Sequence, residues 1–174
     1  AIFNLGVWAA GILLLDFSTV IDHMALQNRQ LQTTAVTDHL TGLYNRYYMD
    51  HQLDFLVETA NRYHHPISLI LFDLDHFKRV NDQYGHDCGD LILTDLAKLV
   101  QASVRDSDLL CRWGGEEFVV LMPLTDLDGA RVAAEKIRQA VDQYPFPNVH
   151  HLTISLGVAT YLPNEQQELW FKRA

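Results

Sequence analysis

Residues 109–122 of this 174-residue chain read LLCRWGGEEFVVLM, two apolar runs on either side of Gly114 and Gly115. A Gly-Gly pair between apolar runs predicts a β-hairpin, because both glycines can adopt the positive φ that a tight turn needs. The runs 109–113 and 117–122 then form neighbouring antiparallel strands. Glu116 leaves the turn directly, so the hairpin carries a carboxylate at its tip.

A second predicted strand also ends in acidic residues. Residues 67–72 form a continuous apolar run of the length of a buried strand, and Asp73 and Asp75 come directly after it. A carboxylate beside a core is costly unless it caps a helix or binds a cation. Asp75 suits a helix N-cap, whereas Asp73 has no such simple role. On the residues alone, Glu116 has the alternative interpretation of a salt-bridge partner on an exposed turn.

Three amphipathic helices are predicted around these strands. Apolar residues recur at helical spacing over 49–63, from about 88 to 104, and over 130–144. A further strand is predicted over 152–161. The order helix, strand, helix, strand hairpin, helix, strand indicates an α+β fold in which helices cover one face of a sheet.

Composition narrows the choice of partner. Thirteen Lys and Arg against 22 Asp and Glu give a net charge of −9, which disfavours a nucleic-acid partner. A small nucleotide stays compatible, because a bound divalent cation reverses the local field around carboxylates. Cys88 and Cys111 lack metal-ligand spacing and favour free thiols in a reducing cytosol, with a disulfide between them as the alternative.

The N-terminal residues have two open interpretations. The apolar run within residues 1–15 is shorter than the roughly 20 residues of a membrane-spanning helix, so it is either the end of such a helix or a packed helix. Residues 16–36 carry near-heptad apolar positions and predict a helical stalk, which either pairs as a coiled coil or packs on its own domain. We expect a catalytic domain over residues 37–174.

Motifs beyond the hairpin support a family resemblance. The sequence GGEEF at 114–118 is a form of the GGDEF signature, and the chain is identified as a member of that family of diguanylate cyclases. The resemblance covers residues 37–174. The other matching motifs, in the family's order and spacing, are DHLTGLYNR at 38–46, DLDHFK at 73–78, ND at 81–82, GHD at 85–87, GD at 89–90 and TISLGV at 153–158.

The resemblance implies a ferredoxin-like or palm-type antiparallel sheet with covering helices. It implies an enzyme that condenses two GTP into cyclic di-GMP and two pyrophosphates. Asp73 and Glu116 match the catalytic residues, and together with the Leu74 carbonyl they match the ligands of Mg²⁺, with Mn²⁺ as an alternative. The expected substrate contacts are Lys78, Asn81, Asp90, Gly114 and Gly115.

Regulation and assembly are also implied. Arg105 and Asp108 match the family's RxxD site for feedback inhibition by the product, with a solvated charged loop as the alternative. One domain holds one GTP, so closing the product requires a homodimer. The domain is expected in the cytoplasm, tethered to the bacterial inner membrane if residues 1–15 end a membrane helix. An alternative function is a catalytically weak module that binds GTP or cyclic di-GMP as a sensor.

Compared with the family pattern, this sequence lacks a final helix. The family continues beyond the equivalent of Ala174 into a helix with basic residues that contact the phosphates of GTP. With that last helix missing, we expect weak GTP binding and an unpartnered, less ordered apolar helix face at residues 169–171.

Overall fold

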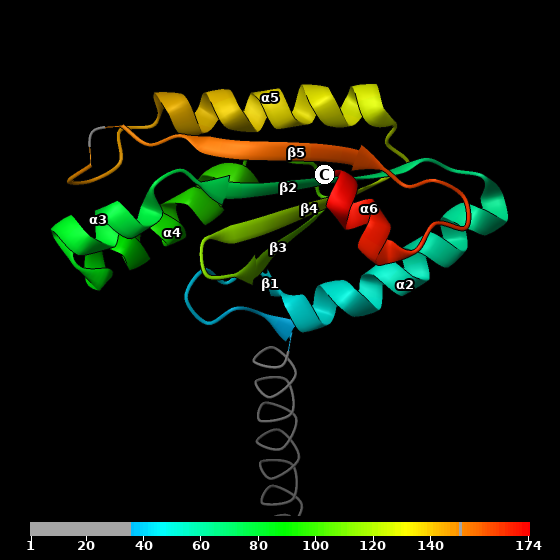
Figure 1. Ribbon diagram of the computed structural model, residues 1–174, viewed down its shortest axis with the longest axis horizontal. Helices are drawn as coiled ribbons and strands as arrows, with labels where there is room; N and C mark the ends of the chain where they lie inside the picture. Colours follow the sequence, from blue (N-terminus) through cyan, green and yellow to red (C-terminus); the bar gives the residue numbers. More distant parts are fainter. Residues whose placement is uncertain (1–35, 150) are drawn as a thin grey trace, which may run out of the picture. The chain divides into compact units, whose positions relative to one another are not determined.

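The structure is a computed structural model that describes residues 36–149 and 151–174, drawn in colour in Figure 1. Residues 37–174 form one compact unit. The expectations for the apolar segment 1–15 and for almost all of the stalk 16–36 lie outside the described residues. Among the helices of the described part, none is both long and apolar enough to cross a membrane.

Five strands form one sheet in the order β1-β3-β4-β2-β5. Neighbouring strands β3, β4, β2 and β5 are antiparallel, as predicted, whereas the short edge strand β1 pairs parallel with β3 and makes the sheet mixed. A strand of two residues carries no periodicity that sequence alone would reveal. The strands are β1 (Tyr44–Asn45), β2 (Ile67–Leu74), β3 (Leu109–Gly114), β4 (Glu117–Pro123) and β5 (Ile154–Thr160).

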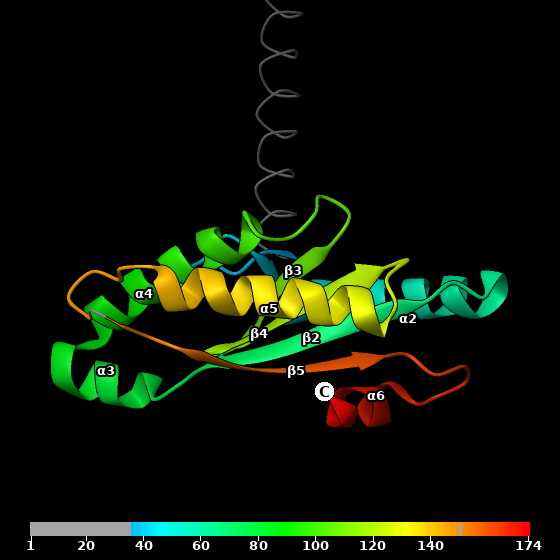
Figure 2. The same ribbon diagram turned by 90° about the horizontal axis from the view of Figure 1, so that it is seen from above.

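Helices cover both faces of this sheet, so the predicted one-sided covering is wrong (Figure 2). Successive residues of a strand point to opposite faces, and in β2 Ile70 and Phe72 join one apolar cluster while Ile67 and Leu69 join the other. The unbroken apolar run of β2 follows from this burial on both faces. One face carries α3 (Phe77–Tyr84), α4 (His86–Gln101) and α5 (Leu127–Gln143), and the other carries α2 (Arg46–Tyr63) and α6 (Gln167–Arg173).

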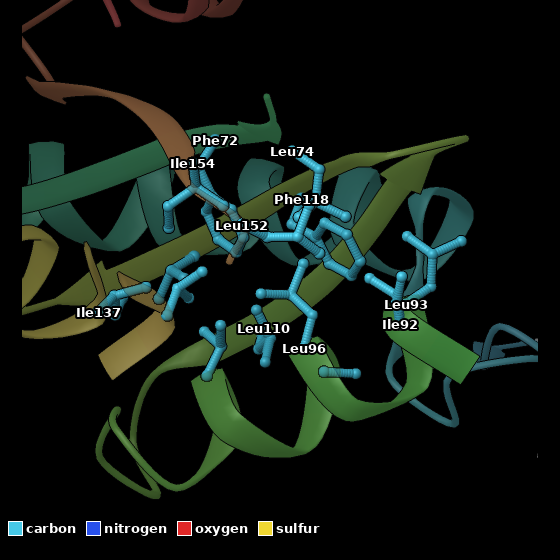
Figure 3. Packing of buried hydrophobic residues seen from close by; sticks show 14 of the residues in the cluster. Phe72, Leu74, Ile92, Leu93, Leu96, Leu110, Phe118, Ile137, Leu152 and Ile154 are labelled. Carbon is cyan, nitrogen blue, oxygen red and sulfur yellow. The ribbon is translucent and has the colours of Figure 1, made fainter. Parts of the chain in front are cut away.

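The larger apolar cluster lies directly behind the acidic strand ends. In Figure 3, side chains from β2 and β4 meet those of α4 and α5. The Phe72 and Phe118 rings stack with their centroids 5.3 Å apart. Each of these buried rings is next to an acidic residue, Asp73 or Glu117, so the core fixes where the two carboxylates emerge.

The chain after β2 differs from the prediction. The sequence predicts a helix from about residue 88, whereas α3 already begins at Phe77 and α4 at His86. His76 precedes α3 in a left-handed conformation, with φ 60°, and provides no side-chain cap. The interpretation of Asp75 as an N-cap is wrong, because its carboxylate accepts hydrogen bonds from the Thr153 and Ser155 hydroxyls and ties β2 to β5.

Both cysteines are buried and form no disulfide within the described residues. Burial raises the pKa of the Cys111 thiol to about 12, so this thiol stays protonated at neutral pH. Cys88 lies in the apolar cluster between the sheet and α4. The prediction of free thiols is confirmed.

The C-terminal helix folds back onto the sheet. Trp170 is fully buried, its Nε1 donates to the Ala159 carbonyl at 2.9 Å, and its ring meets Tyr161 edge to face. Phe171 stacks on Trp113 with the ring centroids 5.0 Å apart. The predicted unpartnered face is therefore wrong for Trp170 and Phe171, because α6 finds its partners on β5 and β3 rather than on a following helix. Leu169 alone is half exposed.

Trp170→Ala is expected to lower the free energy of unfolding by about 3–5 kcal/mol, because it opens a large cavity and leaves the Ala159 carbonyl without its donor. Urea denaturation at 25 °C measures the loss. Leu169→Ala is the matched control in the same helix and should cost far less, because Leu169 is 50% exposed. Equal losses in the two variants would contradict the burial of Trp170 described above.

Candidate active site

Strand pairing brings the acidic residues together at the ends of the neighbouring strands β2 and β4. Asp73 in β2 lies opposite Glu117 in β4 and opposite Ser155 in β5. Glu116 immediately precedes β4 in the turn that follows β3, close enough for the charge of Asp73 to act on it. The hairpin tip and the end of β2 therefore form a single anionic site.

The carboxylates of this site repel one another. Burial raises the pKa of Asp73, and Glu117 and Asp75 raise it further, against a hydrogen bond from the Leu74 backbone. Burial also raises the pKa of Glu116, and the charges of Asp73 and Glu117 add to that effect. Among the described residues Asp73 and Glu116 form no ion pair, so no side-chain cation offsets the repulsion.

One oxygen of this site has no hydrogen-bond partner. Asp73 Oδ1 is buried and makes no hydrogen bond in the structure. A buried, partnerless carboxylate oxygen beside further carboxylates is the arrangement that a divalent cation stabilises. Among the described residues no three His, Cys, Asp or Glu side chains could surround a metal ion. A cation held by Asp73 and Glu116 would therefore take other oxygens as well, such as the Leu74 carbonyl or phosphate.

The Gly-Gly turn leaves open space above the hairpin. Gly115 has φ 55°, and a Cβ added to Gly114 or Gly115 would have no atom within 4 Å. The pairing of β3 with β4 is irregular between Arg112 and Gly114. A bulge of this kind twists the hairpin locally and exposes backbone groups that a regular ladder would occupy. The turn can therefore admit a ligand close to its backbone.

The expected nucleobase contacts come from two adjoining helices. Asn81 lies on α3 and Asp90 on α4, and the two helices meet at Gly85, where φ is 83°. The Asn81 Oδ1 is buried without a hydrogen-bond partner, whereas Asp90 is exposed. Lys78, on the first turn of α3, is exposed and forms no ion pair with another described residue.

Arg105 and Asp108 lie apart from this site. They line a cavity of about 380 Å³ together with Thr37, Tyr44 and Gln101, whereas Asp73 and Glu117 line another of about 300 Å³. Asp108 is buried, and its Oδ2 accepts a hydrogen bond from the Arg105 backbone at 2.9 Å. Its Oδ1 is buried without a hydrogen-bond partner.

An ion pair that sequence reasoning missed supports the turn. Arg112 Nη1 donates to Asp38 at 3.1 and 3.3 Å, and its Nε donates to the Gly115 carbonyl at 2.9 Å. Asp38 also accepts from the Thr41 amide and hydroxyl. Asp38 and Arg112 are 74 positions apart in the sequence, so only their opposite charges beside a turn could have suggested that they pair.

A mixed palm-type sheet with carboxylates beside a Gly-Gly hairpin defines the class of this protein. Residues 35–174 match the family model described as diguanylate cyclase, GGDEF domain. The chain belongs to the GGDEF diguanylate cyclase family.

Individual relatives agree with this assignment. Response regulator PleD of Caulobacter vibrioides is 49% identical over 146 residues, covering 80% of this chain and 32% of PleD. Diguanylate cyclase DgcM of Escherichia coli strain K12 is 42% identical over 148 residues, covering 83% and 35%. The chain thus spans about a third of the length of these curated relatives.

A solved structure with high similarity is that of the coiled coil and GGDEF domain of DgcB from Caulobacter crescentus, crystallised in complex with c-di-GMP. It has a TM-score of 0.84 at 28% identity and covers 92% of this chain and 87% of that chain. The active GGEEF domain of a diguanylate cyclase from Vibrio cholerae has a TM-score of 0.65 at 36% identity, covering 70% and 80%.

Asp38→Asn is expected to lower the free energy of unfolding by about 1–3 kcal/mol at pH 7, because it removes the charged partner of Arg112. Only 14% of the Arg112 side chain and 17% of the Asp38 side chain are exposed, so solvent screens the pair poorly. Asp50→Asn is the control, because its pair with Arg46 is exposed and should contribute less than about 1 kcal/mol.

The same variant has a pH signature. Burial raises the pKa of Asp38, but hydrogen bonds from Thr41 and Arg112 outweigh it and hold the pKa below its usual value. The stabilisation is therefore complete above about pH 4 and is lost as the pH falls through the folded-state pKa. Denaturation curves at neutral and acidic pH should show the difference between parent and Asp38→Asn shrinking in acid. A difference independent of pH would assign the effect to packing.

Proposed function

We propose that this chain is a diguanylate cyclase domain that condenses two GTP into cyclic di-GMP and two pyrophosphates. The observation that carries the proposal is the buried, partnerless oxygen of Asp73, next to Glu116 and the open Gly-Gly turn. Membership of the GGDEF family and the activity named for its relative DgcM support it. In each of two steps the 3′-oxygen of one nucleotide bonds to the α-phosphorus of the other, and the bond from that phosphorus to the pyrophosphate leaving group breaks. The 3′-hydroxyl gives up its proton to solvent.

Asp73, Glu116 and the Leu74 carbonyl would hold the divalent cation, Mg²⁺ or alternatively Mn²⁺. When bound, such a cation stabilises the charge that grows on the transferring phosphoryl group. The chain's own part is to hold the two carboxylates close together, Asp73 near the end of β2 and Glu116 in the turn before β4. Gly114 and Gly115 leave room for phosphate oxygens against backbone N–H groups.

Substrate recognition is assigned to α3, α4 and the loop before them. The Asp90 carboxylate is an acceptor for the N1–H and N2–H of guanine, and the Asn81 amide is suited to another position on the same base. Lys78, exposed on the first turn of α3, supplies positive charge for the phosphates. The phosphate contact Lys78 and the base contact Asn81 are thus one helical turn apart on α3.

Two copies of the domain are needed. One site holds one GTP, and two phosphodiester bonds close the product, so a second domain must face the first with two-fold symmetry. We propose a homodimer for this reason, with residues 16–36 as the segment that holds the copies together.

A second ligand site is proposed at Arg105 and Asp108. Asp108 lines a cavity of about 380 Å³ and its Oδ1 has no hydrogen-bond partner, so this carboxylate favours a ligand with hydrogen-bond donors, which guanine supplies. The DgcB structure was solved in complex with c-di-GMP. Cyclic di-GMP bound here would inhibit synthesis. If the domain is catalytically weak, the same site would let it act as a sensor of cyclic di-GMP.

Incubation with GTP and Mg²⁺, with the nucleotide products identified by mass, tests the activity. Glu116→Gln should reduce turnover by about 100-fold or more, because it removes a charge that acts on the transition state. Its stability should be unchanged or higher, since the substitution relieves repulsion by Asp73 and Glu117. Glu58→Gln, on the exposed face of α2, is the control and should leave turnover intact. Parent-like turnover of Glu116→Gln would remove Glu116 from the mechanism.

Arg105→Ala should raise the cyclic di-GMP concentration for half-inhibition by about tenfold or more, with little change in initial rate, because a charged hydrogen bond is lost outside the carboxylate site. Titration of the product into the GTP reaction measures this shift. Arg131→Ala removes an exposed arginine paired with Asp128 and should not move the curve. If Arg105→Ala left the inhibition curve in place, Arg105 would belong to a solvated loop.

A further inference from the structure

Helices α3 and α4 pack tightly against each other where Gly89 meets Asn81. A Cβ added at Gly89 would lie 2.0 Å from Asn81 Oδ1, 3.1 Å from Asn81 Cγ and 3.0 Å from the Phe77 ring. The first distance is far inside van der Waals contact, so any side chain at position 89 forces the Asn81 amide to move. The terminal atoms of an amide are similar in size, so this clash does not depend on which way the amide faces.

Packing rather than hydrogen bonding locates the Asn81 side chain. Its Oδ1 is buried and has no hydrogen-bond partner in the structure. The Asn81 backbone carbonyl does accept a hydrogen bond, from the Gly85 amide at 2.9 Å. The surface against which the amide lies is therefore the bare backbone of α4 at Gly89. Glycine inside a helix is unfavourable relative to alanine. The glycine at position 89 is therefore explained by its contact with Asn81 and not by the stability of α4.

Gly89 is also adjacent to Asp90. The two proposed guanine contacts are thus joined through a single peptide unit, Asn81 resting on Gly89 and Asp90 following it. We infer that Gly89 is a positioning residue for base specificity: its missing side chain sets the distance between the Asn81 amide and the Asp90 carboxylate so that both contact one guanine. This inference rests on the proposed function of Asn81 and Asp90.

Gly89→Ala should therefore act on recognition of the base. Phe77 is buried in the core and has little room to shift, so the amide, with no hydrogen bond to hold it, gives way. The KM for GTP should rise by about tenfold, as expected for one misplaced hydrogen-bonding group, with kcat little changed. Discrimination between GTP and ITP, which lacks the 2-amino group bound by Asp90, should fall as well, because the displaced amide no longer holds the base in place against that carboxylate.

A double-mutant cycle separates positioning from general packing. In an Asn81→Ala background there is no amide to displace, so Gly89→Ala should change neither the KM nor the GTP:ITP ratio further. Asn81→Ser serves as a second background if the alanine variant is less stable. Gly129→Ala in α5 is the control, because its added Cβ meets Thr125 and Asp126 instead and should change stability without changing the GTP:ITP ratio.

Equal effects of Gly89→Ala with and without the Asn81 amide would overturn the inference. Nucleotide binding measured by calorimetry keeps this test independent of turnover. A parent that binds GTP more tightly than ITP but makes no cyclic di-GMP would contradict the proposed activity and leave the positioning cycle valid. A parent that binds GTP and ITP equally would overturn the inference itself.

Discussion

The antiparallel pairing of β2 with β4 is the constraint on which the site depends. Its register sets Asp73 opposite Glu117, and a slip of one residue would turn every side chain of β2 to the other face. The stacked Phe72 and Phe118 rings, one residue inside the acidic pair, hold that register from the core. Apolar burial thus keeps mutually repelling carboxylates together, which their own charges would oppose.

The hairpin is held from its other side by Arg112. This arginine bonds both the Gly115 carbonyl in the turn and the carboxylate of Asp38 in the loop that follows residue 36. The turn therefore has two supports, one from the core and one from a nearly buried ion pair. Because Asp38 lies two positions after the start of the described chain, a displacement of that loop would reach the turn through a single side chain.

The sequence predicted those features of the fold and site that depend on neighbouring residues along the chain. The apolar run 67–72, the Gly-Gly pair and the acidic residues beside them located β2, the hairpin and the anionic site. Features made by distant residues were missed: the β1 strand, the Asp38–Arg112 pair and the tie from Asp75 to β5. The unbroken apolar run of β2 is typical of a strand buried on both faces, so it favours helices on both sides of the sheet over the one-sided covering predicted from the element order.

The position of β2 between two apolar clusters has a consequence for how the domain opens. Its backbone is hydrogen-bonded on both sides, to β4 and β5, and its side chains enter both clusters. Neither layer of helices can detach completely without exposing one face of this strand, so the two layers share a single cooperative transition. Amide protons of β2 should then exchange with solvent only when the whole domain unfolds, whereas those of the edge strand β5 exchange through smaller openings.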